Sequence, residues 1–97
     1  MIQSFTDKGT EDIFNGIHSN SARRKCPSKL LSVAVRKMDQ LDSVVNLSEL
    51  RIPPGNRLES LHGDRIGQYS IRINDQYRIC FIWTETGPAE VEIIDYH

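Results

Sequence analysis

The sequence predicts an α+β domain, an antiparallel β-sheet with N-terminal helices packed on one of its faces. Two patterns predict this class. In the first half of the chain apolar residues recur at helical spacing, and from residue 57 onwards they alternate with polar residues, as in strands with one buried face. Pro53-Pro54-Gly55 separates the halves, because it must end any preceding helix. At 97 residues the chain fits a single domain, residues 1–97.

The first half is predicted to contain a short strand and two helices. Residues 2–5 are compatible with a strand, and Thr10, followed by two acidic residues, resembles a helix start because carboxylates favour the positive end of the helix dipole. Residues 16–27 are largely polar and basic, which indicates an exposed connection. The clearest helix begins at Pro27 or Ser28. Its apolar positions recur near the helical period: Leu30, Leu31, Val33, Val35, Met38 and Leu41.

The second half is predicted to be a meander of four strands. Their expected ranges are 57–62, 69–74, 77–83 and 89–95. The turn signals between them are Gly63-Asp64, Asn74-Asp75 and Gly87-Pro88. Consecutive strands joined by such turns pair antiparallel, so this half forms the sheet of the α+β domain.

Alternation along the strands predicts which residues face the core. One apolar row is Tyr69, Ile71 and Ile73, and the next is Ile79, Phe81 and Trp83. For both rows to share the core face we expect residue 73 opposite residue 79, with a three-residue loop or a bulge between them. In the last hairpin, Ile79 should lie opposite Ile93 and Phe81 opposite Val91.

The other face of the sheet then carries polar residues that suit phosphate chemistry. Arg72 and Arg78 share this face, Ile94 lies opposite Arg78, and Tyr96 lies two residues further along, within reach of Arg78. Asp95 and His97 stand at its end. Arginine offers a rigid fork of donors that matches a phosphodiester and its more highly charged transition state.

The formal net charge of −1 provides no general attraction to a polyanion, so a nucleic-acid role must rest on local arginines. From residue 51 onwards the basic side chains other than histidine are all arginines: Arg51, Arg57, Arg65, Arg72 and Arg78. The alternative is that these arginines are solvated or paired with nearby carboxylates, as surface ion pairs are common and weak. This alternative is weakest for Arg78, which lies within a strand and faces Tyr96.

Other candidate residues also have structural interpretations. A terminal His97 can simply fray, His62 before a Gly-Asp turn can be solvated, and Tyr96 can pack on Ile94. The two cysteines form no CxxC pair, which indicates reduced structural thiols and no metal site. No apolar segment suits export or membrane insertion, so we expect a cytoplasmic protein.

Three segments closely resemble the HigB toxins of the RelE superfamily. They are GNRLESLHGDR (55–65), GQYSIRINDQYRICF (67–81) and the terminal Asp95-Tyr96-His97, and the opening MIQSF is also similar. The resemblance implies a RelE-like fold and a ribosome-dependent, metal-independent endoribonuclease without a protein nucleophile or cofactor. In such enzymes the 2′-hydroxyl of the messenger RNA attacks the neighbouring phosphorus, leaving a 2′,3′-cyclic phosphate and a 5′-hydroxyl.

The resemblance also implies roles for individual residues. Arg78 matches the arginine assigned to the scissile phosphate, and His97 is the candidate for proton transfer. Tyr96 would stack on or orient a base, and Asp95 would position its neighbours; which of Tyr96 and His97 is acid or base stays open. The remaining candidates for the site are His62, Arg57, Arg65, Arg72 and Glu59.

Two positions depart from a well-studied HigB toxin. His62 stands where that toxin has a lysine, and Glu59 stands where it has a histidine. Because a neutral or titrating imidazole neutralises phosphate less well than lysine, and a carboxylate repels RNA, activity or pH optimum should differ.

The implied partners are the ribosome with its messenger RNA and a HigA-like helix-turn-helix antitoxin, with operator DNA contacted only through that antitoxin. Two other functions compete with the nuclease. One is a weakly active or inactive module that docks the antitoxin for transcriptional autoregulation, which the departures at Glu59 and His62 slightly favour. The other is a direct single-strand RNA binder, which the balanced charge and the lack of an aromatic platform disfavour.

Overall fold

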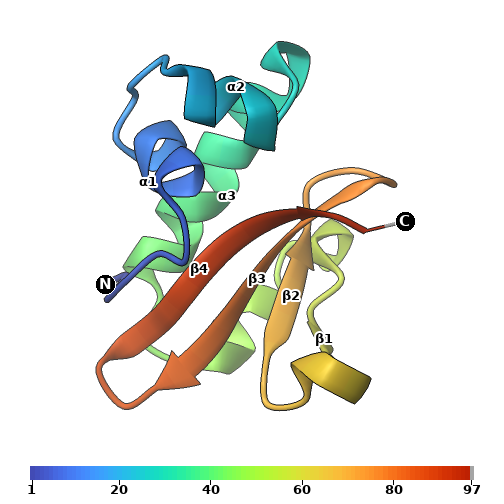
Figure 1. Cartoon of the computed structure of the whole chain (residues 1–97). Coiled ribbons are helices and arrows are strands. Elements are labelled where there is room, and N and C mark those ends of the chain that lie inside the picture. Colours follow the sequence, from blue (N-terminus) through green and yellow to red (C-terminus); the bar gives the residue numbers. More distant parts are fainter. Residues whose placement is uncertain (97) are drawn as a thin grey trace.

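The computed structural model describes residues 1–96, so the predicted proton-transfer residue His97 lies outside the described residues. Helices fill the first half of this range, and the strands of the second half form one antiparallel sheet in the order β1-β2-β3-β4. Figure 1 shows α1 and α3 on one side of that sheet. The predicted α+β class, with the N-terminal helices on one face, is confirmed.

Side-chain caps decide where the first two helices begin. α1 (Lys8–Phe14) starts before the predicted Thr10, because the Asp7 carboxylate accepts a 2.7 Å hydrogen bond from the Thr10 backbone N–H. α2 (Asn20–Lys25) lies inside the segment predicted as an exposed connection, and that prediction is wrong. The Ser19 hydroxyl caps α2 by accepting from the backbone N–H of Ala22 at 3.0 Å.

The central helix begins later than its apolar pattern predicts. Pro27 precedes a 3-10 turn, η1 (Ser28–Leu30), and α3 (Leu31–Ser43) follows. Its residues Ala34, Met38 and Leu41 are fully buried and repeat on one helix face. None of the helices within residues 1–96 is long and apolar enough to cross a membrane.

Two short 3-10 turns connect α3 to the sheet, namely η2 (Leu47–Arg51) and η3 (Pro54–Asn56). The buried Asn56 joins them to α3, because its amide donates to the Leu50 carbonyl at 3.1 Å and to Gln40 Oε1 at 3.0 Å. As expected, the Pro-Pro-Gly segment ends the helical half of the chain.

The strands are β1 (Glu59–Ser60), β2 (Tyr69–Arg72), β3 (Tyr77–Thr84) and β4 (Gly87–Asp95). β1 is much shorter than predicted, because Arg57 before it has a left-handed backbone and the 3-10 turn η4 (Gly63–Arg65) follows it. β4 begins earlier than predicted. Gly87 and Pro88 lie within the strand, since Thr84 Oγ1 closes a tight turn by donating to the Gly87 carbonyl at 2.7 Å.

The β2–β3 register differs from the prediction by two residues. Ile71, and not Ile73, lies opposite Ile79. The side chain of Asn74 accepts from the backbone N–H groups of Gln76 and Tyr77 at 2.9 and 2.7 Å, which tightens the loop around residues 74–76. An even shift leaves every side chain on its predicted face, so the two rows share the core as expected.

The β3–β4 register confirms two predicted pairs, with Ile93 opposite Ile79 and Ile94 opposite Arg78. The ladder then shifts between Cys80 and Ile82, where Glu90 on β4 has a φ of 50°. A bulge absorbs the extra residue, so the buried Val91 and Ile93 still face the helices.

The N-terminal segment covers the outer edge of β4. Phe5 forms a parallel bridge with Val91, and the backbone N–H of Gln3 donates to the Pro88 carbonyl at 2.7 Å. Further along, the hydroxyl of Thr10 accepts from the backbone N–H of Ile93 at 3.1 Å. The predicted N-terminal strand is thus reduced to one bridge that protects the sheet edge.

Candidate active site

Arg78 is the buried cation of the sheet face that lies away from the helices. It is 7% exposed, whereas the side chain of Arg72, opposite it on β2, is 30% exposed. The two arginines lie side by side, and Arg72 pairs with Asp75 from the loop between the strands. The Arg78 charge is therefore desolvated, where its interaction with an anion is stronger than at the surface.

Three hydrogen bonds fix the Arg78 guanidinium along one edge. Nε donates to Ser70 Oγ at 2.7 Å, and Nη2 donates to the Arg57 carbonyl at 2.6 Å and to the Ser70 carbonyl at 3.4 Å. The Arg57 carbonyl reaches this position because Arg57 adopts a left-handed backbone conformation with a φ of 45°. No described residue accepts a hydrogen bond from Nη1.

Tyr96 covers the face of the same guanidinium. The Arg78 Cζ atom lies 5.4 Å from the centre of the Tyr96 ring, a cation–π distance, and Tyr96 is 45% exposed. Its backbone N–H donates to the Gln76 carbonyl at 2.6 Å, which ties the end of β4 to the β2–β3 loop (Figure 1). The predicted contact between Arg78 and Tyr96 is confirmed.

Asp95 is held at the same end of the sheet. The Gln76 side-chain amide donates to Asp95 Oδ2 at 3.0 Å, so Gln76 secures both residues that precede the terminal histidine. Gln76 and Ser70 were not predicted as site residues from the sequence. Glutamine and serine are common uncharged residues that do not by themselves mark an active site in a sequence. Ser70 could nevertheless have been found as a diagonal neighbour of Arg78 on the same sheet face.

The other candidate residues are more dispersed. Arg65 lies in η4 and pairs with Glu92 at 3.4 Å, as the paired-arginine alternative expects. Glu59 is exposed on β1 directly opposite Ser70, which places it on the face that carries Arg78. His62 precedes η4, is exposed, and its imidazole makes no hydrogen bond to another described residue. Arg57 contributes its carbonyl to Arg78, while its side chain is exposed.

The cysteines contribute no reactive group to this face. Both are free and buried, and burial raises the pKa of the Cys80 thiol to about 11 despite the nearby Arg65. A thiol with this pKa is neutral and unreactive near pH 7. Among residues 1–96, no three His, Cys, Asp or Glu side chains are grouped so as to hold a metal ion.

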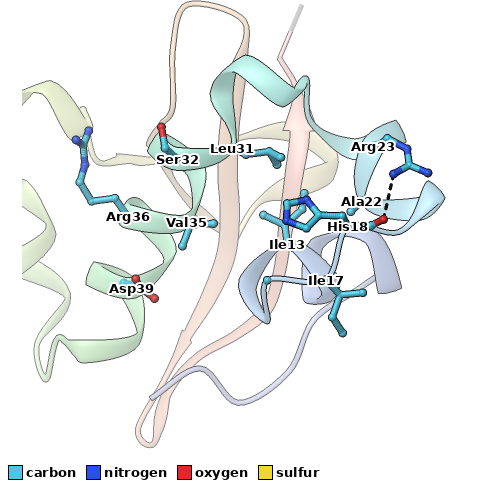
Figure 2. A pocket seen from close by; sticks show the side chains of 11 residues that line it. Ile13, Ile17, His18, Ala22, Arg23, Leu31, Ser32, Val35, Arg36 and Asp39 are labelled. Carbon is cyan, nitrogen blue, oxygen red and sulfur yellow. Dashed lines mark hydrogen bonds between the residues drawn. The ribbon is translucent and has the colours of Figure 1, made fainter.

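A separate groove of about 470 Å³ lies between α1, α2 and α3. Ile13, Ile17 and Val35 line it, and Figure 2 shows Arg23 and Arg36 on its opposite sides. None of the candidate site residues of the sheet lines this groove, so the two surfaces are distinct.

Comparison with known proteins gives a family and a fold. The family described as the RelE-like toxin HigB of type II toxin–antitoxin systems matches residues 3–97. Toxin HigB-1 of Vibrio cholerae serotype O1 is 39% identical over 97 residues, which cover 100% of this chain and 98% of that toxin.

Two solved structures have the same fold at low sequence identity. The YoeB/ParE toxin from Agrobacterium tumefaciens is 18% identical with a TM-score of 0.51, covering 98% of both chains. The YoeB-YefM complex from Staphylococcus aureus is 16% identical with a TM-score of 0.54, covering 100% of this chain and 98% of that one. The RelE-like fold that the resemblance implied is confirmed.

Proposed function

Because this chain belongs to the HigB-like family of RelE-like toxins in type II toxin–antitoxin systems, we propose that it inhibits translation by cleaving messenger RNA on the ribosome. The observation that carries the proposal is the buried Arg78, held by Ser70 and Arg57 beneath the exposed ring of Tyr96. This preorganised cation is suited to stabilising the charge that develops on a phosphate.

The proposed reaction is an attack of RNA on itself. The 2′-oxygen forms a bond to the adjacent phosphorus, the bond from phosphorus to the 5′-oxygen breaks, and the products are a 2′,3′-cyclic phosphate and a 5′-hydroxyl. One group must take the proton of the 2′-hydroxyl and another must protonate the leaving 5′-oxygen. We assign these transfers to His97 with Tyr96, and Asp95 positions them.

Arg78 lowers the activation barrier for cleavage by stabilising the extra negative charge of the pentacoordinate phosphorus. Arg72 lies directly opposite it and extends the positive surface along the RNA backbone. Arg57 and Arg65 flank this surface as weaker phosphate contacts, and His62 occupies the position of a second cation. Glu59 opposes RNA binding on the β1 side of the same face.

In this proposal the ribosome brings the messenger RNA to the protein. A net charge of −1 favours no association with free RNA, so the ribosome must present the message and orient its phosphate. The partner that restrains this activity is an antitoxin of the HigA-like helix-turn-helix type, which also carries the toxin to operator DNA. The competing function, an inactive docking module, has no support among the comparisons.

The test compares one message in two states. Purified protein should cut the message when it is threaded through a translating ribosome, and it should leave the same naked RNA intact at equal concentration. New 5′ ends are mapped by primer extension, and 2′,3′-cyclic phosphate termini identify the reaction. Efficient cutting of the naked RNA would overturn ribosome dependence, and an uncut ribosome-bound message would overturn the nuclease.

A further inference from the structure

The hydroxyl of Ser70 is the acceptor of the Arg78 Nε–H group, which bonds to no other described residue. Ser70 Oγ lies 2.7 Å from Arg78 Nε and the whole residue is buried. We propose that Ser70 is a positioning residue that orients Arg78 for the phosphate, an inference that rests on the proposed function. It acts through Arg78 and does not itself touch RNA.

The hydrogen bonds of the guanidinium decide which of its donors stay available to a phosphate. Of its five N–H groups, Nε and Nη2 carry three, and both of these nitrogens donate to acceptors in the sheet and in the segment before β1. The ring of Tyr96 covers one planar face. This leaves Nη1, whose two N–H groups have no acceptor among the described residues, to meet the phosphate oxygens.

The hydroxyl of Ser70 has a different effect from the two carbonyls. Both carbonyls bind Nη2, so without the Ser70 hydroxyl the guanidinium keeps its position at Nη2 but can pivot around it. The two-point attachment at Nε and Nη2 removes this pivot. Since the charge is unchanged by pivoting, loss of the hydroxyl should impair orientation in the transition state more than binding of RNA.

The register between β2 and β3 places the Ser70 hydroxyl beside Arg78. Ser70 on β2 lies opposite Cys80 on β3, two residues along the strand from Arg78 and on the same sheet face. Long side chains reach such a diagonal neighbour, whereas a residue on the core face could not.

The experiment measures single-turnover cleavage of ribosome-bound message at increasing toxin concentration. For Ser70→Ala we expect a fall of about 10-fold or more in the maximal rate, with the half-saturating concentration within about twofold of wild type. Ser70→Thr retains the acceptor and should stay within about threefold of wild type. Ser48→Ala, on the exposed η2 turn, is the matched control and should cleave normally.

A double-mutant cycle separates positioning from a structural effect. Alanine at position 78 leaves Ser70 no donor to hold, so Ser70→Ala should change the residual rate less than about twofold in an Arg78→Ala protein. A full further loss in that background would show that Ser70 acts independently of Arg78 and would overturn the inference. Wild-type cleavage by a folded Ser70→Ala protein would overturn it as well.

A second readout distinguishes failure of this inference from failure of the proposed function. The ¹⁵N resonance of Arg78 Nε–H should show a slowly exchanging proton in the wild-type protein and a rapidly exchanging one in Ser70→Ala. If the wild-type protein leaves ribosome-bound message intact, the nuclease proposal fails, while this resonance still decides whether Ser70 orients Arg78. An unprotected Nε–H in the wild-type protein refutes the positioning role even in an active toxin.

Discussion

Replacing Arg78 with alanine tests the chemistry and the packing of the site together. The change removes a preorganised cation whose Nε and Nη2 hydrogen bonds measure 2.7 and 2.6 Å. Loss of one such group from a catalytic site costs about 10²–10³-fold in rate, so we expect cleavage of ribosome-bound message to fall by about 10²-fold or more.

The same change should leave the protein folded. Hydrogen bonds to a charged group contribute about 1.5–3 kcal/mol each, but water can enter the vacated space and satisfy the Ser70 hydroxyl and the Arg57 carbonyl. We therefore expect the free energy of unfolding to fall by about 2–3 kcal/mol, out of the 5–15 kcal/mol typical of a small domain. Antitoxin binding by the variant, measured with purified proteins, should persist.

Two measurements on one preparation check these magnitudes. Urea unfolding followed by circular dichroism gives the loss of stability, and primer extension on ribosome-bound message gives the loss of cleavage. Arg78→Lys is the companion variant, because it keeps the charge and loses the fork; we expect it to remain at least about 10-fold slower than wild type. A folded Arg78→Ala protein that cuts at the wild-type rate would remove Arg78 from the site.

The remaining predictions concern four other positions. Tyr96→Phe keeps the ring over the guanidinium but removes the hydroxyl that we assign to proton transfer, so cleavage should fall by about 10²-fold or more; a Tyr96→Phe protein that cuts at the wild-type rate would show that Tyr96 acts by stacking alone. Deleting His97 should abolish toxicity while leaving the melting temperature nearly unchanged, and a deleted protein that still arrests growth refutes its assignment as a proton carrier. His62→Lys should maintain or raise cleavage by adding a permanent cation, and a clear fall in rate would contradict the mapping of this position. Hydrogen bonds from Ser19 and, to a smaller extent, from Lys8 lower the pKa of Asp12 below its usual 3.8. The ionised Asp12 therefore stabilises the fold above about pH 4, and this stabilisation is lost as the pH falls through the lowered pKa. In urea unfolding between about pH 2 and pH 6, the free energy of unfolding should therefore fall less steeply with decreasing pH for Asp12→Asn than for the wild-type protein. Identical pH profiles would contradict this assignment.

The site was predictable in part because strand alternation is a local property. Side chains on a strand have a period of two, so Arg72, Arg78 and Tyr96 could be assigned to one face before any pairing was known. The assignment survived an error in the β2–β3 register, because that error was an even number of residues. The short α2 helix was missed for the opposite reason. Its polar sequence has no apolar stripe, and its start depends on one Ser19 cap.

The sequence by itself determined the α+β class, the polar face of the sheet and the family, because periodicity and motif identity are both contained in the order of residues. Only the tertiary structure decided how Arg78 is held. Its acceptors come from Ser70 on β2 and from the backbone of Arg57 before β1, 8 and 21 residues away along the chain. A backbone carbonyl carries no sequence signal, and its direction follows from the left-handed conformation that Arg57 adopts at the end of η3. The orientation of the cation, on which the proposed chemistry depends, is therefore a product of the assembled sheet.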